Sequence, residues 1–197
     1  MKENGSFTED KTITILETAA KYTYADYAKL DDDKRYEVID GVVYLMSPGA
    51  TERHQDINGE LFLQFGSFLK GKPCKVFHPP FDVCLNAAGD DDKTVVQPDI
   101  IIVCDKSKLD GKRCNGAPDL IVEILSRSNR SHDICLKFDK YLQAGVREYW
   151  IVDPEEKVVL VNILKNGEYV AKTYNENHNI SVHVLDGCII NLKEVFL

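Results

Sequence analysis

The sequence predicts a mixed α/β fold in which many neighbouring strands are antiparallel. Two observations support this prediction. Segments with helical periodicity alternate with short β-branched runs, and the hairpin-type turns Asp40-Gly41 and Asn166-Gly167 join several of those runs. The chain has 197 residues, of which 44% are hydrophobic and 28% charged. This composition is typical of a folded protein, so we expect one domain over 1–197, with a loose tail at 1–11.

A short helix is expected near the start of the folded region. Thr23 followed by Asp26 resembles a capping box, in which the two residues satisfy each other's backbone donors. The helix should therefore begin at Tyr24.

A hairpin and a long amphipathic helix come next. The arms 35–39 and 42–46 flank the Asp-Gly turn, and their alternation places Glu37 on one face of the first arm. Apolar residues at three- and four-residue spacing then predict a helix at 51–69. His54 lies at the start of its inward face.

Two apolar runs in the middle of the chain, 94–103 and 119–126, are expected to be buried strands. Each contains one carboxylate, Asp99 in the first run and Glu123 in the second. The remaining elements are strands at 75–78 and 81–85, a loop at 105–118, a helix at 131–144, and strands at 147–153, 157–164, 168–174, 181–185 and 188–192.

The two strand carboxylates suggest a shared metal site. Burying an ionised carboxylate costs several kcal/mol unless it is paired or binds a cation. Mg²⁺ is typically held by one or two carboxylates together with water and substrate phosphate. Asp99 and Glu123 suit this role. The alternative for Asp99 is an exposed acid at a strand end, but the apolar runs on both sides of it favour the metal-binding interpretation.

Three further residues are candidates for the same site. Lys137 borders the apolar face of the helix after the Glu123 strand, where it could stabilise charge on a phosphate; alternatively, it is solvated and paired with Asp133. Glu37 is either a third acid or part of a salt bridge within the hairpin. His54 is either a ligand or base, or a packed and hydrogen-bonded core histidine.

Composition narrows the protein class further. The net charge of −8 argues against a broadly basic nucleic-acid-binding surface. The sequence lacks both an apolar run of about 18 residues and an apolar signal-peptide core, so we expect no membrane span.

The six cysteines form no CxxC pair, and several lie in apolar runs, including Cys84, Cys104 and Cys135. We therefore expect reduced, buried cysteines in a cytoplasmic protein.

Several motifs of the chain belong to one known pattern. They are Tyr36-Glu37-Val38-Ile39-Asp40-Gly41, Ser47-Pro48, His54, Val96-Gln97-Pro98-Asp99, Val122-Glu123-Ile124-Leu125-Ser126, Ser128, Asp133, Lys137, Tyr141 and Gly145-Val146-Arg147-Glu148-Tyr149-Trp150-Ile151-Val152-Asp153-Pro154. Together, from about 23 to 154, they resemble the Uma family of restriction endonucleases, which belongs to the PD-(D/E)XK nuclease superfamily.

The resemblance implies an αβββαβ core that begins with the helix at 51–69. Asp99 would be the acid of the PD half and Glu123 the acid of the (D/E)XK half. Leu125 stands where the superfamily has its lysine, and the resemblance implies that Lys137 on the following helix substitutes for it. Glu37 and His54 match further family positions.

The implied function is a Mg²⁺-dependent (or Mn²⁺-dependent) endonuclease that hydrolyses phosphodiester bonds in DNA. A homodimer would suit double-strand cutting. One alternative is a catalytically inactive nuclease-fold module that binds DNA or a protein, because Leu125 replaces the motif lysine and the chain is acidic. Another is a phosphodiesterase acting on small nucleotides.

Overall fold

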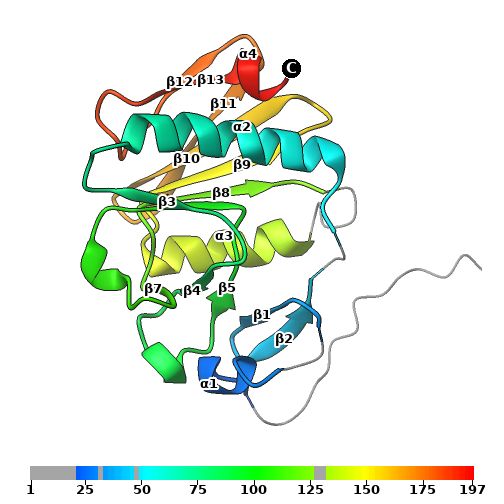
Figure 1. Cartoon of the computed structure of the whole chain (residues 1–197), viewed down its shortest axis with the longest axis vertical. Helices are drawn as coiled ribbons and strands as arrows, with labels where there is room; N and C mark the ends of the chain where they lie inside the picture. The colour runs from blue at the N-terminus through cyan, green and yellow to red at the C-terminus, as the bar shows by residue number, and fades with distance from the viewer. Residues whose placement is uncertain (1–20, 31–32, 47–48, 127–131) are drawn as a thin grey trace, which may run out of the picture.

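The structure, a computed structural model, describes residues 21–30, 33–46, 49–126 and 132–197, with side chains in the last range described from 135 onward. In this part of the chain, helices pack against a six-stranded and a five-stranded sheet (Figure 1). The helices are α1 (Tyr24–Tyr27), α2 (Glu52–Leu69), α3 (His132–Ala144) and α4 (Leu192–Val195), with 3₁₀ turns η1 (Gly89–Asp91) and η2 (Lys106–Lys108). No helix in these ranges is long and apolar enough to cross a membrane.

The six-stranded sheet contains the predicted αβββαβ core. Its strands, in spatial order, are β11 (Glu168–Asn175), β10 (Val158–Lys165), β9 (Glu148–Asp153), β8 (Leu120–Ile124), β6 (Ile100–Val103) and β3 (Lys75–Phe77). Following the chain, α2, β3, β6, β8, α3 and β9 form the core in the expected order. Only β8 and β9 are parallel in this sheet, because α3 connects them as a crossover.

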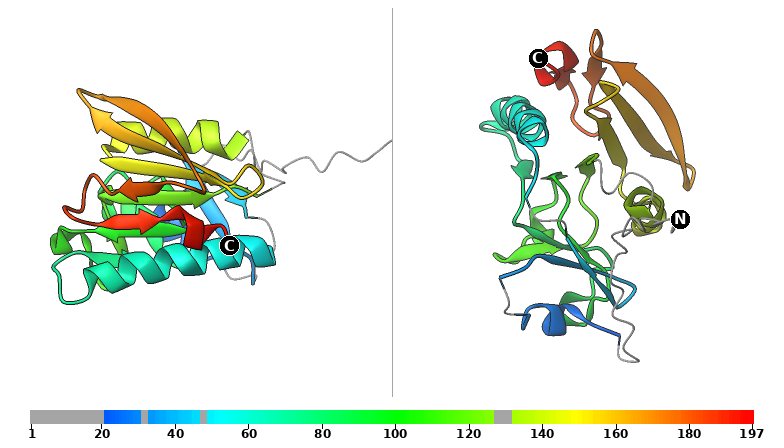
Figure 2. Two further views of the ribbon diagram at one scale, coloured as in Figure 1. Left: turned by 90° about the horizontal axis from the view of Figure 1, so that it is seen from above. Right: turned by 90° about the vertical axis from the view of Figure 1, so that its right-hand side faces the viewer.

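A five-stranded sheet lies below this core in Figure 1. Its spatial order is β2 (Val42–Leu45), β1 (Tyr36–Ile39), β5 (Val95–Val96), β4 (Asp82–Cys84) and β7 (Arg113–Asn115). A small two-stranded sheet, β12 (Asn179–Ser181) with β13 (Ile189–Asn191), lies beside α4 near the C-terminus (Figures 1 and 2).

Strand alternation builds a hydrophobic core on each face of the six-stranded sheet. Ile100 and Ile102 of β6 pack with the buried stripe of α2 and with α4. Ile101 and Val103 point the opposite way and pack with α3 and the five-stranded sheet. Glu123 lies between buried neighbours on β8 and faces the α3 side, so the acid is directed between α3 and the five-stranded sheet.

The predicted strand at 94–103 is wrong in one respect, because the segment forms two strands in different sheets. β5 belongs to the five-stranded sheet and β6 to the six-stranded sheet. The break falls at 97–99, where Pro98 lacks the N–H that a continuous ladder needs. Asp99 therefore lies immediately before β6 rather than within a strand.

Two other predicted segments also differ from the structure. The expected loop at 105–118 contains η2 and β7. The expected strand at 181–185 instead turns, with Leu185 N–H donating to Val182 O and Cys188 N–H to Leu185 O, so only Ser181 belongs to a strand. The expected tail at 1–11 and the motif residues Ser47-Pro48 and Ser128 lie outside the described residues.

The prediction of uniformly reduced, buried cysteines is also wrong. Cys74 and Cys104 form a disulfide. The antiparallel register of β3 and β6 pairs Lys75 with Val103, which brings the residues just beyond this pair face to face. Cys84 is buried and free as expected, whereas Cys135 is exposed on α3.

Candidate active site

The structure brings the five predicted residues together from five separate segments. Glu37 comes from β1, His54 from the first turn of α2, Asp99 from the link before β6, Glu123 from β8, and Lys137 from α3. Direct contacts join His54 to Asp99 and Lys137 to both glutamates. The acids therefore lie where the two sheets, α2 and α3 meet.

Lys137 is the centre of this cluster. Its side chain is only 9% exposed, and its Nζ donates to Glu37 Oε1 at 2.9 Å and to Glu123 Oε1 at 3.1 Å. The helix thus brings a lysine to the acids where Leu125 cannot. Lys137 is therefore buried against two site acids rather than solvated as in the alternative prediction; the side chain of Asp133, the partner in that alternative, lies outside the described residues.

Asp99 is held by two groups. Its Oδ2 accepts the Ile124 N–H at 2.8 Å and lies 3.2 Å from His54 Nε2. Ile124 follows Glu123 on β8, so this backbone bond fixes Asp99 against the strand that carries the second acid. Because an ionised carboxylate can only accept hydrogen bonds, Nε2 of His54 is the protonated donor to Asp99 Oδ2.

Glu37 is held by groups outside its own hairpin. Besides Lys137, the Gln97 backbone N–H donates to Glu37 Oε1 at 2.8 Å, so the predicted alternative of a salt bridge within the hairpin is not what the structure contains. The expected alternation of the arm is confirmed, since Val38 and Ile39 belong to different hydrophobic clusters.

Gln97 was not singled out as a site residue. Its Nε2 donates to Asp82 Oδ1 and Tyr27 OH, and its Oε1 accepts from Arg35. Asp82 thus supports Gln97, whose backbone N–H in turn supports Glu37. The sequence offered one signal, a polar residue inside an apolar run immediately before the Pro98 break.

Tyr141 belongs both to the hydrophobic core and to the site. Its ring is fully buried, and its hydroxyl donates to Glu123 Oε1 at 2.6 Å. It lies one helical turn after Lys137, so the two side chains share a face of α3. That four-residue spacing was the available signal.

Burial and mutual repulsion shape the ionisation of the cluster. Burial, assisted by the negative charges of Asp99 and Glu37, raises the pKa of Glu123 to about 7, although Lys137 and the Tyr141 hydroxyl oppose the shift. For Lys137, burial disfavours the charged form, but Glu123 and Glu37 outweigh it and raise the pKa. Lys137 is therefore a fixed cation, and Glu123 is the acid that changes charge near neutral pH.

His54 is held at the edge of the cluster. Its backbone N–H donates to the N-cap residue Thr51, which fixes the first turn of α2. Burial lowers the pKa of His54, but the hydrogen bond to Asp99 and the charges of Asp99 and Glu123 raise it above its ordinary value. Its Nδ1 atom is buried and has no partner among the described residues.

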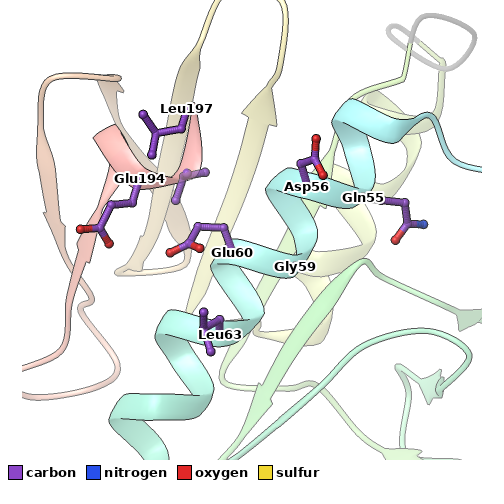
Figure 3. A pocket seen from close by; sticks show the side chains of 8 residues that line it. Gln55, Asp56, Gly59, Glu60, Leu63, Glu194 and Leu197 are labelled. Atoms are coloured by element: carbon purple, nitrogen blue, oxygen red, sulfur yellow. The ribbon is translucent and has the colours of Figure 1, made fainter.

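No group of three or more His, Cys, Asp or Glu side chains in the described ranges is arranged to hold a metal ion. A hollow of about 470 Å³ lies elsewhere, between α2 and the C-terminal segment, lined by Asp56, Glu60, Leu63, Glu194 and Leu197 among others (Figure 3). None of the five predicted residues lines it, so it is separate from the acid cluster.

The αβββαβ core with acids beside β6 and β8 defines a nuclease-type fold. A crystal structure from Anabaena variabilis ATCC 29413, described as a "putative nuclease belonging to DUF820", is similar with a TM-score of 0.70 and 20% identity, covering 89% of this chain and 97% of that one. The family Uma2, described as "Putative restriction endonuclease", matches residues 23–193. The chain belongs to this family, as its motifs predicted. No curated protein matches the sequence.

Proposed function

We propose that the protein is a divalent-metal-dependent endonuclease that hydrolyses phosphodiester bonds in DNA. The observation that carries the proposal is the gathering of three acids at one place: Lys137 contacts Glu37 and Glu123, and Asp99 is bonded to the backbone N–H of Ile124, the residue after Glu123. A structural salt bridge needs one acid for one lysine. The three acids outnumber the one lysine among them, which favours a further cation. Burial first, and then the negative charges of Asp99 and Glu37, raise the pKa of Glu123.

Two of the acids each have a carboxylate oxygen that is available to bind a cation. Asp99 Oδ1 and Glu123 Oε2 receive no hydrogen bond from the described residues, since the contacts of these acids use Oδ2 and Oε1. Hard ions such as Mg²⁺ and Mn²⁺ prefer carboxylate oxygens, so Asp99 and Glu123 would hold the ion. The chemistry that such an ion supplies when bound is polarisation of a phosphoryl oxygen and acidification of a bound water.

The chain's own residues have distinct tasks in this proposal. Lys137 stays protonated, so it cannot act as a base; its Nζ holds Glu123 and Glu37 in place and provides positive charge for a phosphate. His54 Nε2 orients Asp99, and the Tyr141 hydroxyl orients Glu123. The positioning groups thus leave one oxygen of each metal-binding acid unshared.

Cleavage of supercoiled plasmid DNA in Mg²⁺ or Mn²⁺ tests the proposal. Asp99→Asn and Glu123→Gln remove the ligand charges with little change of shape, and each should reduce the cleavage rate by at least about 100-fold, equivalent to about 2.7 kcal/mol of barrier. Asp105→Asn is the matched control, because Asp105 is an exposed acid that caps η2. Equal cleavage by the wild type and both site variants would refute the assignment.

One observation favours a non-catalytic alternative, a nuclease-fold module that binds DNA or a protein. Lys137 already occupies the space between Glu37 and Glu123 as an internal counter-ion. Calorimetry separates the two functions: absent Mn²⁺ binding combined with intact DNA affinity supports the module. A screen of small phosphodiesters separates the third function, since hydrolysis of those substrates with DNA left intact would exclude a DNA endonuclease.

A further inference from the structure

Within the described part of the chain, the six-stranded sheet has one long edge without a neighbouring strand, formed by β11. This strand spans eight residues and, among the described elements, pairs only with β10. Most of its residues are exposed, including Val170 at 52%. Figure 2 shows the β10–β11 hairpin along the outer side of the sheet.

The opposite edge is protected in ways that β11 is not. β3 has only three residues, is preceded by Pro73 and is followed by Pro79-Pro80. Short strands and prolines are common means of preventing edge-to-edge pairing. β11 contains no proline, and its single lysine, Lys172, lies four residues after Glu168. The two charges offset each other along the strand, so β11 remains open to a partner strand.

The hairpin turn determines which backbone groups of β11 point outward. Asn166 and Gly167 both have positive φ, 53° and 86°, which identifies a two-residue type I′ turn. In such a hairpin the closing pair, Lys165 and Glu168, is hydrogen bonded, and bonded pairs then alternate along the ladder. The residues whose N–H and C=O point away from β10 are therefore Tyr169, Ala171, Thr173 and Asn175.

We propose that β11 pairs antiparallel with β11 of a second copy of this chain. The proposal concerns the assembly and does not depend on nuclease activity. In a two-fold dimer, the outward-pointing residues of one β11 must lie opposite the outward-pointing residues of the other. Because these residues alternate along the strand, the two-fold axis must pass between the same residue of the two copies, and this residue is the centre of the register. Centring on Val170 places each Glu168 opposite Lys172 of the other copy, and the two exposed Val170 side chains against each other.

The competing registers are less favourable. Centring on Lys172 places two lysines opposite each other, which is destabilising. Centring on Ala171 places the charged Lys172 opposite the apolar Val170 and leaves Glu168 without a cation. Charge complementarity therefore selects both the occupant, a second copy, and the register centred on Val170.

Analytical ultracentrifugation of the full chain, without DNA or metal, tests the interface. The wild type should dimerise at micromolar concentration. Glu168→Lys or Lys172→Glu replaces two attractive pairs by two repulsive ones and should weaken the dimer by about 10-fold or more, whereas the double swap should restore it to within about 3-fold. A monomeric wild type, or a double swap as weak as the single variants, would overturn the proposal.

Cysteine cross-linking tests the register. In a Cys135→Ser background, which removes the exposed native thiol, Val170→Cys should form a disulfide-linked dimer, because non-hydrogen-bonded partners lie about 4.5 Å apart at Cα. Ala171→Cys is the matched control and should remain largely monomeric under the same oxidant. Cross-linking through position 171 rather than 170, or through neither position, would overturn the register.

Discussion

Replacing Lys137 by methionine tests whether the lysine neutralises the acids as their geometry indicates. The change keeps a long side chain but removes the charge that Glu37 and Glu123 share. Removing one partner of a buried ion pair costs about 3–5 kcal/mol, because the remaining charge is left uncompensated. For a chain of this size, that corresponds to a fall in Tm of about 6–20 °C at pH 8.5.

The loss of folding stability in Lys137→Met should be larger at high pH than at low pH. A carboxyl group whose pKa is raised on folding destabilises the folded state as pH rises from its unfolded pKa through its folded pKa. The pKa of Glu123 is already about 7, and removing Lys137 should raise it further, so at pH 5.5 the acid is neutral and needs no cation. Urea denaturation of the wild type and Lys137→Met should therefore give a much smaller stability difference at pH 5.5 than at pH 8.5.

Lys140→Met is the matched control for this experiment. Lys140 lies on the same helix and pairs with Asp40, whose side chain is 58% exposed, at 2.7 Å. Because an exposed ion pair contributes at most about 1 kcal/mol, this variant should lose little stability. If Lys137→Met lost no more stability than Lys140→Met, or lost the same amount at both pH values, the internal counter-ion role would be refuted.

Three further predictions concern the same cluster. Mn²⁺ binding near pH 6.5 should release protons, because the pKa of Glu123 is raised to about 7; calorimetry in buffers of different ionisation enthalpy measures the release, which should decline by pH 8.5. Tyr141→Phe removes a hydrogen bond that lowers the pKa of Glu123, so the pH midpoint of Mn²⁺ binding should move up by about one unit, and an unchanged midpoint would contradict the contact. Gln97→Leu removes one of the two side-chain donors to Asp82 Oδ1, leaving the Tyr27 hydroxyl, and also removes the acceptor of Arg35, so it should cost about 1–3 kcal/mol in thermal denaturation, whereas Gln143→Leu at an exposed position should cost almost nothing.

The elements that depend on local patterns were predictable from the sequence. Both hairpins arise from dipeptides suited to positive φ, and α2 follows from its apolar stripe. The break at 97–99 was missed because apolar runs on both sides of it look continuous, although Pro98 marks the place. Hydrophobicity indicates that a segment is buried but not which of two sheets buries it.

The supporting groups of the candidate site were harder to predict than its acids. An acid or lysine beside apolar residues is conspicuous, because burying a charge is costly. Nothing in the local sequence around Gln97 or Tyr141 shows which groups they bind. The partner of Gln97, Arg35, is 62 residues away in the sequence. The disulfide between Cys74 and Cys104, which are 30 residues apart, likewise depends on the pairing of β3 with β6, which no local pattern reveals.

The crossing of the chain between its two sheets at Asp99 has a consequence for the order in which the cluster forms. Glu37 belongs to one sheet, Glu123 to the other, and Asp99 to the segment that links them. A partly folded chain with only one sheet in place therefore has scattered acids and no cluster. The cluster therefore forms only when both of these sheets and α3 are in place, so a partly folded molecule should be inactive.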